Sequence, residues 1–262
     1  MKIAVCVKQV PDSEATLSID AAKTGIVESG LSFEINGYDR YALEAALRFK
    51  DAGECQVVAV TIGPERAAQA LKTCLATGAD RAIHLKDPAF QGGDPWSNAT
   101  ALAAALGPES PDLILCGLQS DDLNLTQTPV LLAERLGVPH ATAVMRIEGI
   151  AGGVRVEREL ENDRREVLEL PFPALLAVQT GLNEPRYASI KGIMAAKKKE
   201  LKALSPEDLG LEPAQVGRAG ARIKFFDLHL PPKKEGGEIL SGSSEEIAAE
   251  LVKRIREHTG LI

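Results

Sequence analysis

The first 136 residues alternate between short apolar runs typical of buried strands and longer stretches with helical periodicity. Because strands separated by helices need crossover connections, this alternation favours parallel strand pairing with helices on both faces of the sheet. The chain is therefore predicted to adopt an α/β fold with a doubly wound, mostly parallel sheet, whose ligands bind at the carboxyl ends of the strands. The predicted strands cover residues 2–7, 56–62, 81–85 and 112–116, and the predicted helices cover residues 38–50, 65–77, 96–106 and 126–136.

The pattern changes after Pro139. Residues 144–148, 154–160 and 166–170 alternate apolar and polar side chains between turn-forming segments, which predicts antiparallel strands, and residues 174–179 predict one more buried strand. Residues 202–237 are rich in Pro, Gly and Lys, so we expect them not to pack on a core of their own. Residues 244–257 form an amphipathic helical pattern, which has to cover either another subunit or this same domain.

The composition favours a soluble, cytoplasmic protein. Among the 262 residues no apolar run approaches the roughly 20 residues that span a bilayer, so membrane insertion is not expected. Residues 1–5 pass directly into the first predicted strand without the pattern of a signal segment. A net charge of −7 and a pI of 5.3 argue against nucleic acid as the main partner. The cysteines lie far apart and lack metal-ligand spacing, so we expect free thiols and no metal at Cys6, Cys55, Cys74 and Cys116.

Three predicted strands end in residues that would let a ligand approach the backbone. Cys6 closes the first strand, Ile62 precedes a Gly-Pro pair, and Gly117 follows the fourth strand. Residues 124–129, Asn-Leu-Thr-Gln-Thr-Pro, then lead into a predicted helix, whose free amides and dipole favour an anion such as a phosphate. The residues alone leave two interpretations open here, a phosphate site and an ordinary helix cap.

Residues 182–190, Leu-Asn-Glu-Pro-Arg-Tyr-Ala-Ser-Ile, do not have the pattern of a core element. Pro185 fixes its own φ and biases Glu184 toward extended geometry, so the chain is expected to turn out of the sheet. Tyr187 and Ile190 are then presented among polar residues, and a run of lysines at 197–199 closes the segment. We expect residues 179–199 to form a docking loop with Ile190 as its apolar anchor, although a lysine run by itself is more often a solvated helix end.

This stretch, together with the Ile-Met pair at 193–194, closely resembles the signature of the electron-transfer flavoprotein β subunit. The resemblance covers nearly the whole chain, because further family motifs occur in the family's order at residues 5–8, 36–39, 63–65, 78–81, 117–128, 156–173 and 206–210. It implies a sheet of the adenine-nucleotide α-hydrolase-like type with an antiparallel β extension. It also implies an α/β nucleotide-binding domain over residues 1–200, followed by an arm and a terminal helix over residues 201–262 that contact the α subunit of a heterodimer.

The resemblance further implies two cofactors. AMP would occupy the strand-end site, and the chain would help to enclose an FAD held mainly by the α subunit, in agreement with the lack of a G-x-G-x-x-G fingerprint. Asp121 and Asp122 would repel a phosphate, so we expect them to cap backbone amides or to meet the ribose, and Tyr38 falls at the family's aromatic position near the flavin ring. The residues expected at the cofactors are Cys6, Asn36, Gly37, Tyr38, Asp39, Ile62, Gly117, Gln119, Ser120, Asp121, Asp122, Leu123, Asn124, Leu125, Thr126, Gln127 and Thr128.

Members of this family are electron carriers without turnover chemistry of their own. They pass electrons from flavoprotein dehydrogenases, such as the acyl-CoA dehydrogenases of fatty acid oxidation, to a quinone-linked acceptor, and bifurcating relatives hold a second FAD in place of AMP. Lys191 and Gly192 replace the usual Pro and Asn, which is expected to loosen the loop. The residues expected at protein partners are Glu159, facing the mobile flavin domain, and Tyr187, Ile190, Ile193 and Met194, facing the dehydrogenase.

Two other classes share the expected sheet. A non-redox adenine-nucleotide sensor of the universal-stress type would carry a Gly-x-x-Gly motif after the strand at 113–116, and this spacing is not found. An ATP-cleaving enzyme of the related pyrophosphatase type would carry Ser-Gly-Gly-x-Asp-Ser after the first strand, where this chain has Lys-Gln-Val-Pro-Asp at 8–12. The sensor is kept as the alternative interpretation.

Overall fold

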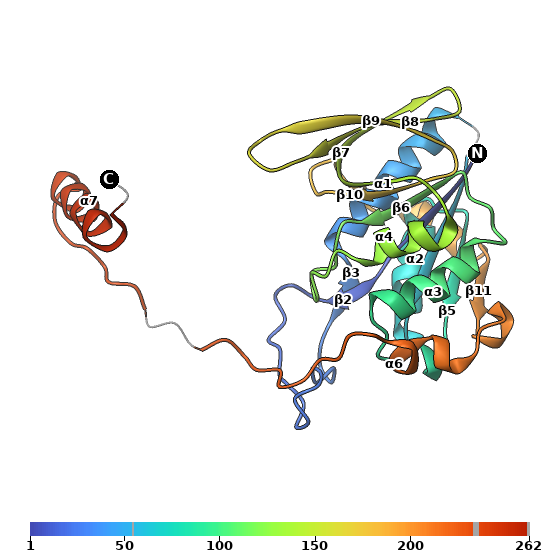
Figure 1. Cartoon of the computed structure of the whole chain (residues 1–262), viewed down its shortest axis with the longest axis horizontal. Coiled ribbons are helices and arrows are strands. Elements are labelled where there is room, and N and C mark those ends of the chain that lie inside the picture. The colour runs from blue at the N-terminus through green and yellow to red at the C-terminus, as the bar shows by residue number, and fades with distance from the viewer. Residues whose placement is uncertain (54, 233–235, 261–262) are drawn as a thin grey trace.

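A computed structural model describes residues 1–53, 55–232 and 236–260. Its centre is a nine-stranded sheet with the order β11-β5-β4-β1-β6-β10-β7-β8-β9 (Figure 1). The strands of this sheet are β1 (Lys2–Cys6), β4 (Gln56–Ile62), β5 (Arg81–Leu85), β6 (Leu113–Gly117), β7 (His140–Ile150), β8 (Gly153–Glu159), β9 (Arg165–Pro171), β10 (Ala174–Val178) and β11 (Leu201–Leu204). A separate antiparallel pair, which the sequence did not predict, consists of β2 (Gln9–Pro11) and β3 (Phe33–Ile35).

Helices cover both faces of the parallel part of the sheet, as predicted. On β1, Ile3 and Val5 face one buried cluster and Ala4 faces the other, because successive side chains of a strand point to opposite faces. The first cluster lies under α1 and α2 and the second under α3 and α4. The helices are α1 (Gly37–Ala52), α2 (Ala68–Thr77), α3 (Pro95–Leu106), α4 (Thr128–Leu136), α5 (Ile190–Ala196), α6 (Gly217–Gly220) and α7 (Ser244–Thr259).

The antiparallel extension is also confirmed. β7 runs parallel to β10, and β8 and β9 then pair antiparallel in succession, which extends the sheet beyond its helix-covered part. The sequence pattern shows this difference because each antiparallel strand has one buried face and one exposed face, whereas β6 and β10 are buried throughout.

Residues 202–237 were expected to have no core of their own, and the first part of this range packs on the core of the domain. β11 adds a parallel strand at the edge of the sheet beside β5. Farther along, Val216 is fully buried in the cluster under α3, next to α6. Only two of the four side chains of β11 are partly buried, so the strand lacks the apolar run by which buried strands are recognised.

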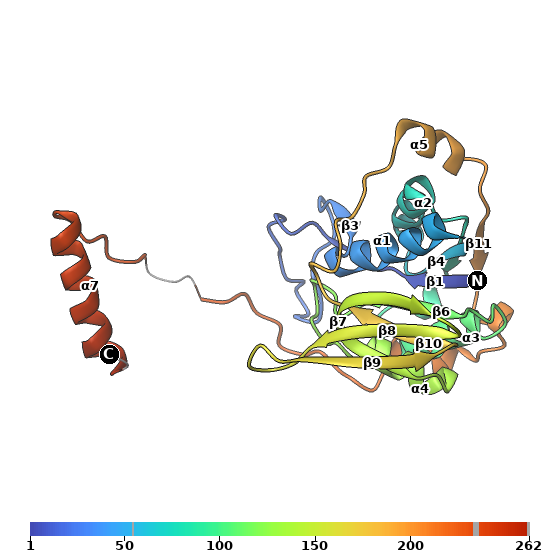
Figure 2. The ribbon, with the colours of Figure 1, turned by 90° about the horizontal axis from the view of Figure 1, so that it is seen from above.

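After Ile223 the chain still contacts Lys23, whose ammonium lies 3.0 Å from the Asp227 carboxylate and whose carbonyl accepts from the amide of Leu228 at 2.9 Å, and it then leaves the domain. Residues 224–232 are almost all exposed, and none of the residues of α7 is buried. Both views place α7 far from the sheet (Figures 1 and 2). A capping box between Ser243 and Glu246 begins this helix, so its formation has a local cause in the sequence. We call residues 224–262 the arm.

Candidate functional site

A cavity of about 310 Å³ opens at the carboxyl end of β1. The chain winds outward from β1 to β4 and β5 and then returns to the other side of β1 with β6, so the strand order reverses between β1 and β6. Ligands of open α/β sheets bind at such a reversal because the loops leave in opposite directions and open a crevice. The predicted position of the site at the strand ends agrees with this topology.

The cavity brings together most of the residues that the sequence predicted around the cofactors. Cys6 and Cys116 lie on neighbouring strands at its floor, and both cysteines are free. The apolar side chains that line the cavity include Val60, Ile62, Phe90 and Leu102. The predicted residues that line the cavity are Cys6, Asn36, Asp39, Ile62, Gly117, Gln119, Ser120, Leu123, Leu125, Thr126, Gln127 and Thr128.

Asp39 joins the ends of two strands beneath the cavity. Its carboxylate accepts hydrogen bonds from the amide of Lys8 at 2.7 Å and from the amide of Gly117 at 3.0 Å. A Cβ atom at Gly117 would stand 2.3 Å from Oδ1 of Asp39, so only glycine lets the carboxylate approach this backbone. Burial raises the pKa of Asp39 to about 7, against the opposing effect of these hydrogen bonds.

Gly37, Tyr38 and Asp121 do not line the cavity, but together with Asn36 they hold the loop that does. The amide of Gly37 donates to Asp121 at 2.8 Å, which confirms the expectation that this carboxylate caps a backbone amide. Asn36 accepts from the amide of Asp121 at 2.9 Å and donates to the carbonyl of Gln119 at 2.9 Å. The Gln119 side chain in turn donates to the hydroxyl of Tyr38 at 3.0 Å.

The mouth of the cavity carries an ion pair. The Lys8 ammonium lies 2.7 Å from the Asp122 carboxylate and 3.3 Å from the Ser120 hydroxyl. Asp122 therefore faces a cation here, and Lys8 lines the cavity with its charge already balanced.

Helix α4 points its N-terminus at the cavity. The helix begins at Thr128, two residues later than predicted, because Thr126 has a φ of 56° that no right-handed helix can include. Its N-cap residue, Gln127, makes no side-chain capping bond, so the first turn offers amide donors to a ligand. Asn124 also has a positive φ, of 51°, and a loop held in two such conformations is typical of binding sites.

One wall of the cavity was not predicted. It comes from the loop between β5 and α3, at Gly92 and Gly93, and from Asn98 in the first turn of α3. The Gly-Gly-Asp-Pro sequence at 92–95 was the available signal, because it combines a flexible turn with an N-cap and a Pro in the first helical turn.

The docking segment, residues 179–199, arches away from the domain and returns to it through α5 (Figure 2). Its apolar side chains are exposed to an unusual degree, with Tyr187 at 91% and Ile190 at 84%. Ile193 and Met194 are exposed as well, which leaves α5 with no buried residue. Large apolar side chains gathered in this way mark interaction surfaces more often than isolated ones do.

The remaining predicted partner residue lies elsewhere. Glu159 ends β8 on the antiparallel extension and is exposed, with the Gln179 side chain 3.4 Å away. Glu159 therefore contacts the docking segment at its first residue, Gln179.

Two features are absent from the described residues. No group of three or more His, Cys, Asp or Glu side chains in that part of the chain could hold a metal ion. Among residues 1–53, 55–232 and 236–260, none of the helices combines the length and apolar character needed to cross a membrane.

Comparison with known proteins assigns this architecture to a family. The family model described as the electron transfer flavoprotein domain matches residues 23–209. The caffeyl-CoA reductase-Etf complex subunit CarD of Acetobacterium woodii is 38% identical, over 98% of this chain and 98% of its own length. The electron transfer flavoprotein β subunits of Thermoanaerobacterium thermosaccharolyticum and Bacillus subtilis are 37% and 36% identical, over 97% and 100% of this chain. The chain therefore belongs to the electron transfer flavoprotein family, as a β subunit.

Proposed function

We propose that this β subunit binds AMP in the cavity at the end of β1 and docks a flavoprotein dehydrogenase through residues 179–199. The dehydrogenase would be one that acts on CoA thioesters, such as an acyl-CoA dehydrogenase. The name of the relative CarD supports this class, since it places that protein in a complex with a caffeyl-CoA reductase. Electrons would pass on to a quinone-linked acceptor, in a heterodimer that works in the cytoplasm.

The cavity fits a mononucleotide. Its volume of about 310 Å³ is at the small end of the range for ligand pockets, roughly 300–1,000 Å³. The uncapped first turn of α4 and the hydroxyls of Thr126 and Thr128 would hold the phosphate, while Ile62 and Phe90 would contact the base. A second FAD in place of AMP is the alternative occupant.

FAD supplies reversible electron transfer when bound, and in this family it is held mainly by the α subunit. The role of this chain toward the flavin is then to enclose it and to position the domain that carries it. Tyr38, held by Gln119, and Glu159 on β8 are the residues we assign to these contacts. Separate surfaces for the dehydrogenase and for the flavin domain allow the flavin to move while the dehydrogenase stays docked.

The observation that carries the docking proposal is the exposure of Ile190, at 84%, on a segment that is attached to the domain on both sides of this residue. A side chain this exposed contributes little to the folded state, but an apolar anchor that fills a partner's pocket commonly contributes about 2 kcal/mol or more to binding.

The test uses the heterodimer with its α subunit and a short-chain acyl-CoA dehydrogenase with butyryl-CoA. Ile190→Ala should raise the dehydrogenase concentration needed for half-maximal flavin reduction by about tenfold or more. Its melting temperature and its flavin and AMP content should match the wild type. Val27→Ala is the matched control, since Val27 is an exposed aliphatic residue outside the docking segment. An unchanged concentration dependence for Ile190→Ala would refute the docking role.

The occupant of the cavity is decided by extracting the purified heterodimer and counting nucleotides. We expect about one AMP and one FAD per heterodimer, and added AMP should raise the melting temperature by mass action. Two FAD molecules and no AMP per heterodimer would mean that a second flavin occupies the cavity. A heterodimer that binds AMP but holds no flavin would favour the non-redox sensor instead.

A further inference from the structure

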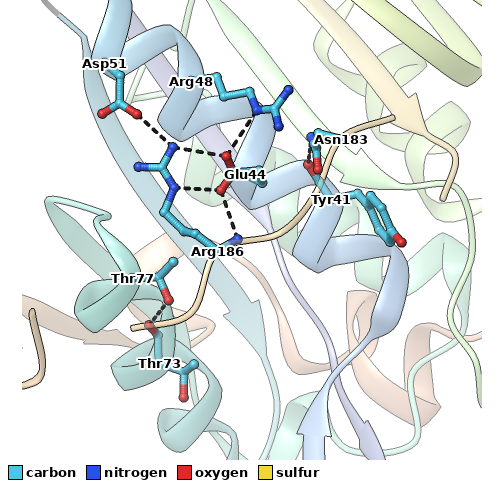
Figure 3. A network of polar contacts seen from close by, with 8 residues as sticks. All are labelled: Tyr41, Glu44, Arg48, Asp51, Thr73, Thr77, Asn183 and Arg186. Carbon is cyan, nitrogen blue, oxygen red and sulfur yellow. Dashed lines mark hydrogen bonds and ion pairs between the residues drawn. The ribbon is translucent and has the colours of Figure 1, made fainter. Parts of the chain in front are cut away.

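The docking segment is attached to α1 through the ion pairs of Arg186. Figure 3 shows Arg186 reaching from the segment to Glu44, with Asp51 on its other side. Three nitrogen atoms of Arg186 take part: its amide and Nε donate to Oε2 of Glu44 at 3.2 and 2.7 Å, and one terminal nitrogen donates to Oε1 at 3.0 Å and to Asp51 at 2.7 Å. An arginine that bonds one carboxylate with both its backbone and its guanidinium is fixed in orientation as well as in place.

Glu44 is a buried carboxylate that needs a cation beside it. It is only 4% exposed, so its charge needs compensation from nearby cations. Burial disfavours its ionisation, but the hydrogen bonds from Arg186 and Arg48 outweigh that effect and hold the pKa of Glu44 below its ordinary value. Nothing in the packing of α1 itself requires a carboxylate at this position, because the neighbouring buried residues of the helix are apolar.

Three further attachments hold the same segment. Before Arg186, the Asn183 side chain donates to the carbonyl of Tyr41 on α1 at 3.0 Å. After it, α5 packs on the last turn of α2, where a Cβ atom at Gly192 would stand 2.2 Å from the carbonyl oxygen of Ala76. Gly192 thus has a packing reason, in contrast to the looser loop expected from the sequence. The segment ends with the Lys199 ammonium on the carbonyls of Leu75 and Ala79, at 2.9 and 2.6 Å.

We infer that Arg186 is a positioning residue for docking: by fixing the segment to Glu44 and Asp51 of α1, it holds Tyr187 and Ile190 in the arrangement that the dehydrogenase recognises. This inference rests on the docking role proposed above. Tyr187 follows Arg186 directly and Ile190 lies four residues beyond it, so a fixed backbone at Arg186 limits where both side chains project.

The attachment at Arg186 preorganises the docking segment for binding. Residues 187–190 make no side-chain contact that buries Tyr187 or Ile190, so these residues rely on the flanking attachments for their arrangement. Without the attachment at Arg186, the dehydrogenase would have to order the segment as it binds, and that ordering lowers affinity without removing any contact in the bound state. Electron transfer within the docked complex would be unaffected.

The test compares two arginines on one carboxylate. Arg186→Ala removes the attachment of the docking segment at Glu44 and Asp51, whereas Arg48→Ala removes the other cation from Glu44, which Arg48 contacts at 3.1 Å, and leaves that attachment in place. With butyryl-CoA and a short-chain acyl-CoA dehydrogenase, we expect Arg186→Ala in the heterodimer to raise the apparent KM for the dehydrogenase about tenfold with an unchanged kcat. Amide hydrogen exchange at 182–198 should accelerate in the same variant. Arg48→Ala should change neither quantity.

Conservative variants guard against a folding defect. Arg186→Lys keeps the charge but cannot make the forked contacts, so its KM should lie between those of the wild type and Arg186→Ala. Glu44→Gln, which weakens the same contact from the other side, should raise KM in the same direction. An unchanged KM in Arg186→Lys and Glu44→Gln, or an equal rise in Arg48→Ala, would overturn the inference.

The outcome for Ile190→Ala separates this inference from the docking proposal. If Ile190→Ala impairs reduction and Arg186→Ala does not, docking stands and the positioning role of Arg186 is rejected. If neither variant changes KM, the docking proposal itself fails.

Discussion

At the scale of single residues, the cavity depends on buried polar side chains whose partners are backbone amides. Asp39, 5% exposed, bridges the amides of Lys8 and Gly117, and Asn36, 1% exposed, bridges the loop at Gln119 and Asp121. The sequence predicted these positions as part of the site. It could not separate ligand-contacting residues from supporting ones, because Lys8 and Gly117 meet Asp39 only after β1 and β6 have been arranged side by side and α1 has packed on them.

Asp39 gives a prediction about pH. Its pKa rises from 3.8 to about 7 on folding, so between these values the native state binds the proton more tightly than the unfolded chain does. The stability that Asp39 contributes is therefore present at low pH and is lost as the pH rises through about 7. Between pH 4 and pH 8 we expect a loss on the order of 2–4 kcal/mol from this group.

The measurement is urea unfolding of the wild type and of Asp39→Asn across this range. Asn cannot titrate, so the free energy of unfolding of the wild type minus that of the variant should fall with rising pH. A difference that grows with pH would mean that the amide donors, and not burial, dominate the titration of Asp39.

At the scale of helices and strands, the sequence predicted every element of the helix-covered part of the sheet up to β10 except for small shifts at the ends. Each of these elements has either a continuous apolar run or one buried face. β11 was missed because an edge strand with Lys202 and Ala203 exposed has neither property. The late start of α4 was missed for another reason, since a positive φ at Thr126 cannot be foreseen from a residue type that disfavours it.

The N-terminus of α3 links the cavity to the point where the chain leaves the domain. Asp94, 2% exposed, caps α3 through the amide of Ser97 at 2.9 Å and also accepts from the amides of Arg222 and Ile223 at 2.7 and 2.9 Å. Beside it the Arg222 guanidinium stacks on the Trp96 ring, 3.4 Å from the ring centroid. The start of the arm is therefore fixed to the loop that forms one wall of the cavity.

Asp94→Ala should destabilise the protein by about 2–3 kcal/mol, because one buried and two partly buried amides lose their acceptor at once. Asp208→Ala is the control, since Asp208 accepts only from the nearby Ser205, in an exposed turn. Thermal unfolding of the two variants, in the presence and absence of AMP, measures how much stability each of them loses. Equal melting temperatures for Asp94→Ala and Asp208→Ala would show that Asp94 caps α3 without holding the start of the arm.

At the scale of the whole molecule, the chain consists of a packed domain and an arm whose described side chains are not buried against that domain. The arm exposes large apolar side chains along its length, at Phe225, Phe226, Leu230, Ile239, Leu251, Val252 and Ile255. On α7 the last three of these lie at helical spacing, on one face of a helix that has no buried residue. Such a face needs a partner, and the α subunit of the heterodimer is the partner we propose for it.

Deleting residues 224–262 should therefore abolish assembly and leave the domain folded. Each large apolar side chain of the arm would contribute about 1.5–3 kcal/mol if it became fully buried against the α subunit. The loss of several of them would remove most of the binding free energy of an ordinary heterodimer. The described part of the arm supplies no buried side chain to the domain. We expect the truncated chain to bind AMP, to melt close to the temperature of the isolated full-length chain, and to recover neither the α subunit nor FAD on co-purification. The full-length chain expressed alone should likewise hold little FAD and should be less stable than the heterodimer, and Lys224→Ala, a single polar change in the arm, should assemble normally. Recovery of a stoichiometric, FAD-containing heterodimer from the truncated chain would show that the α subunit binds the domain and not the arm.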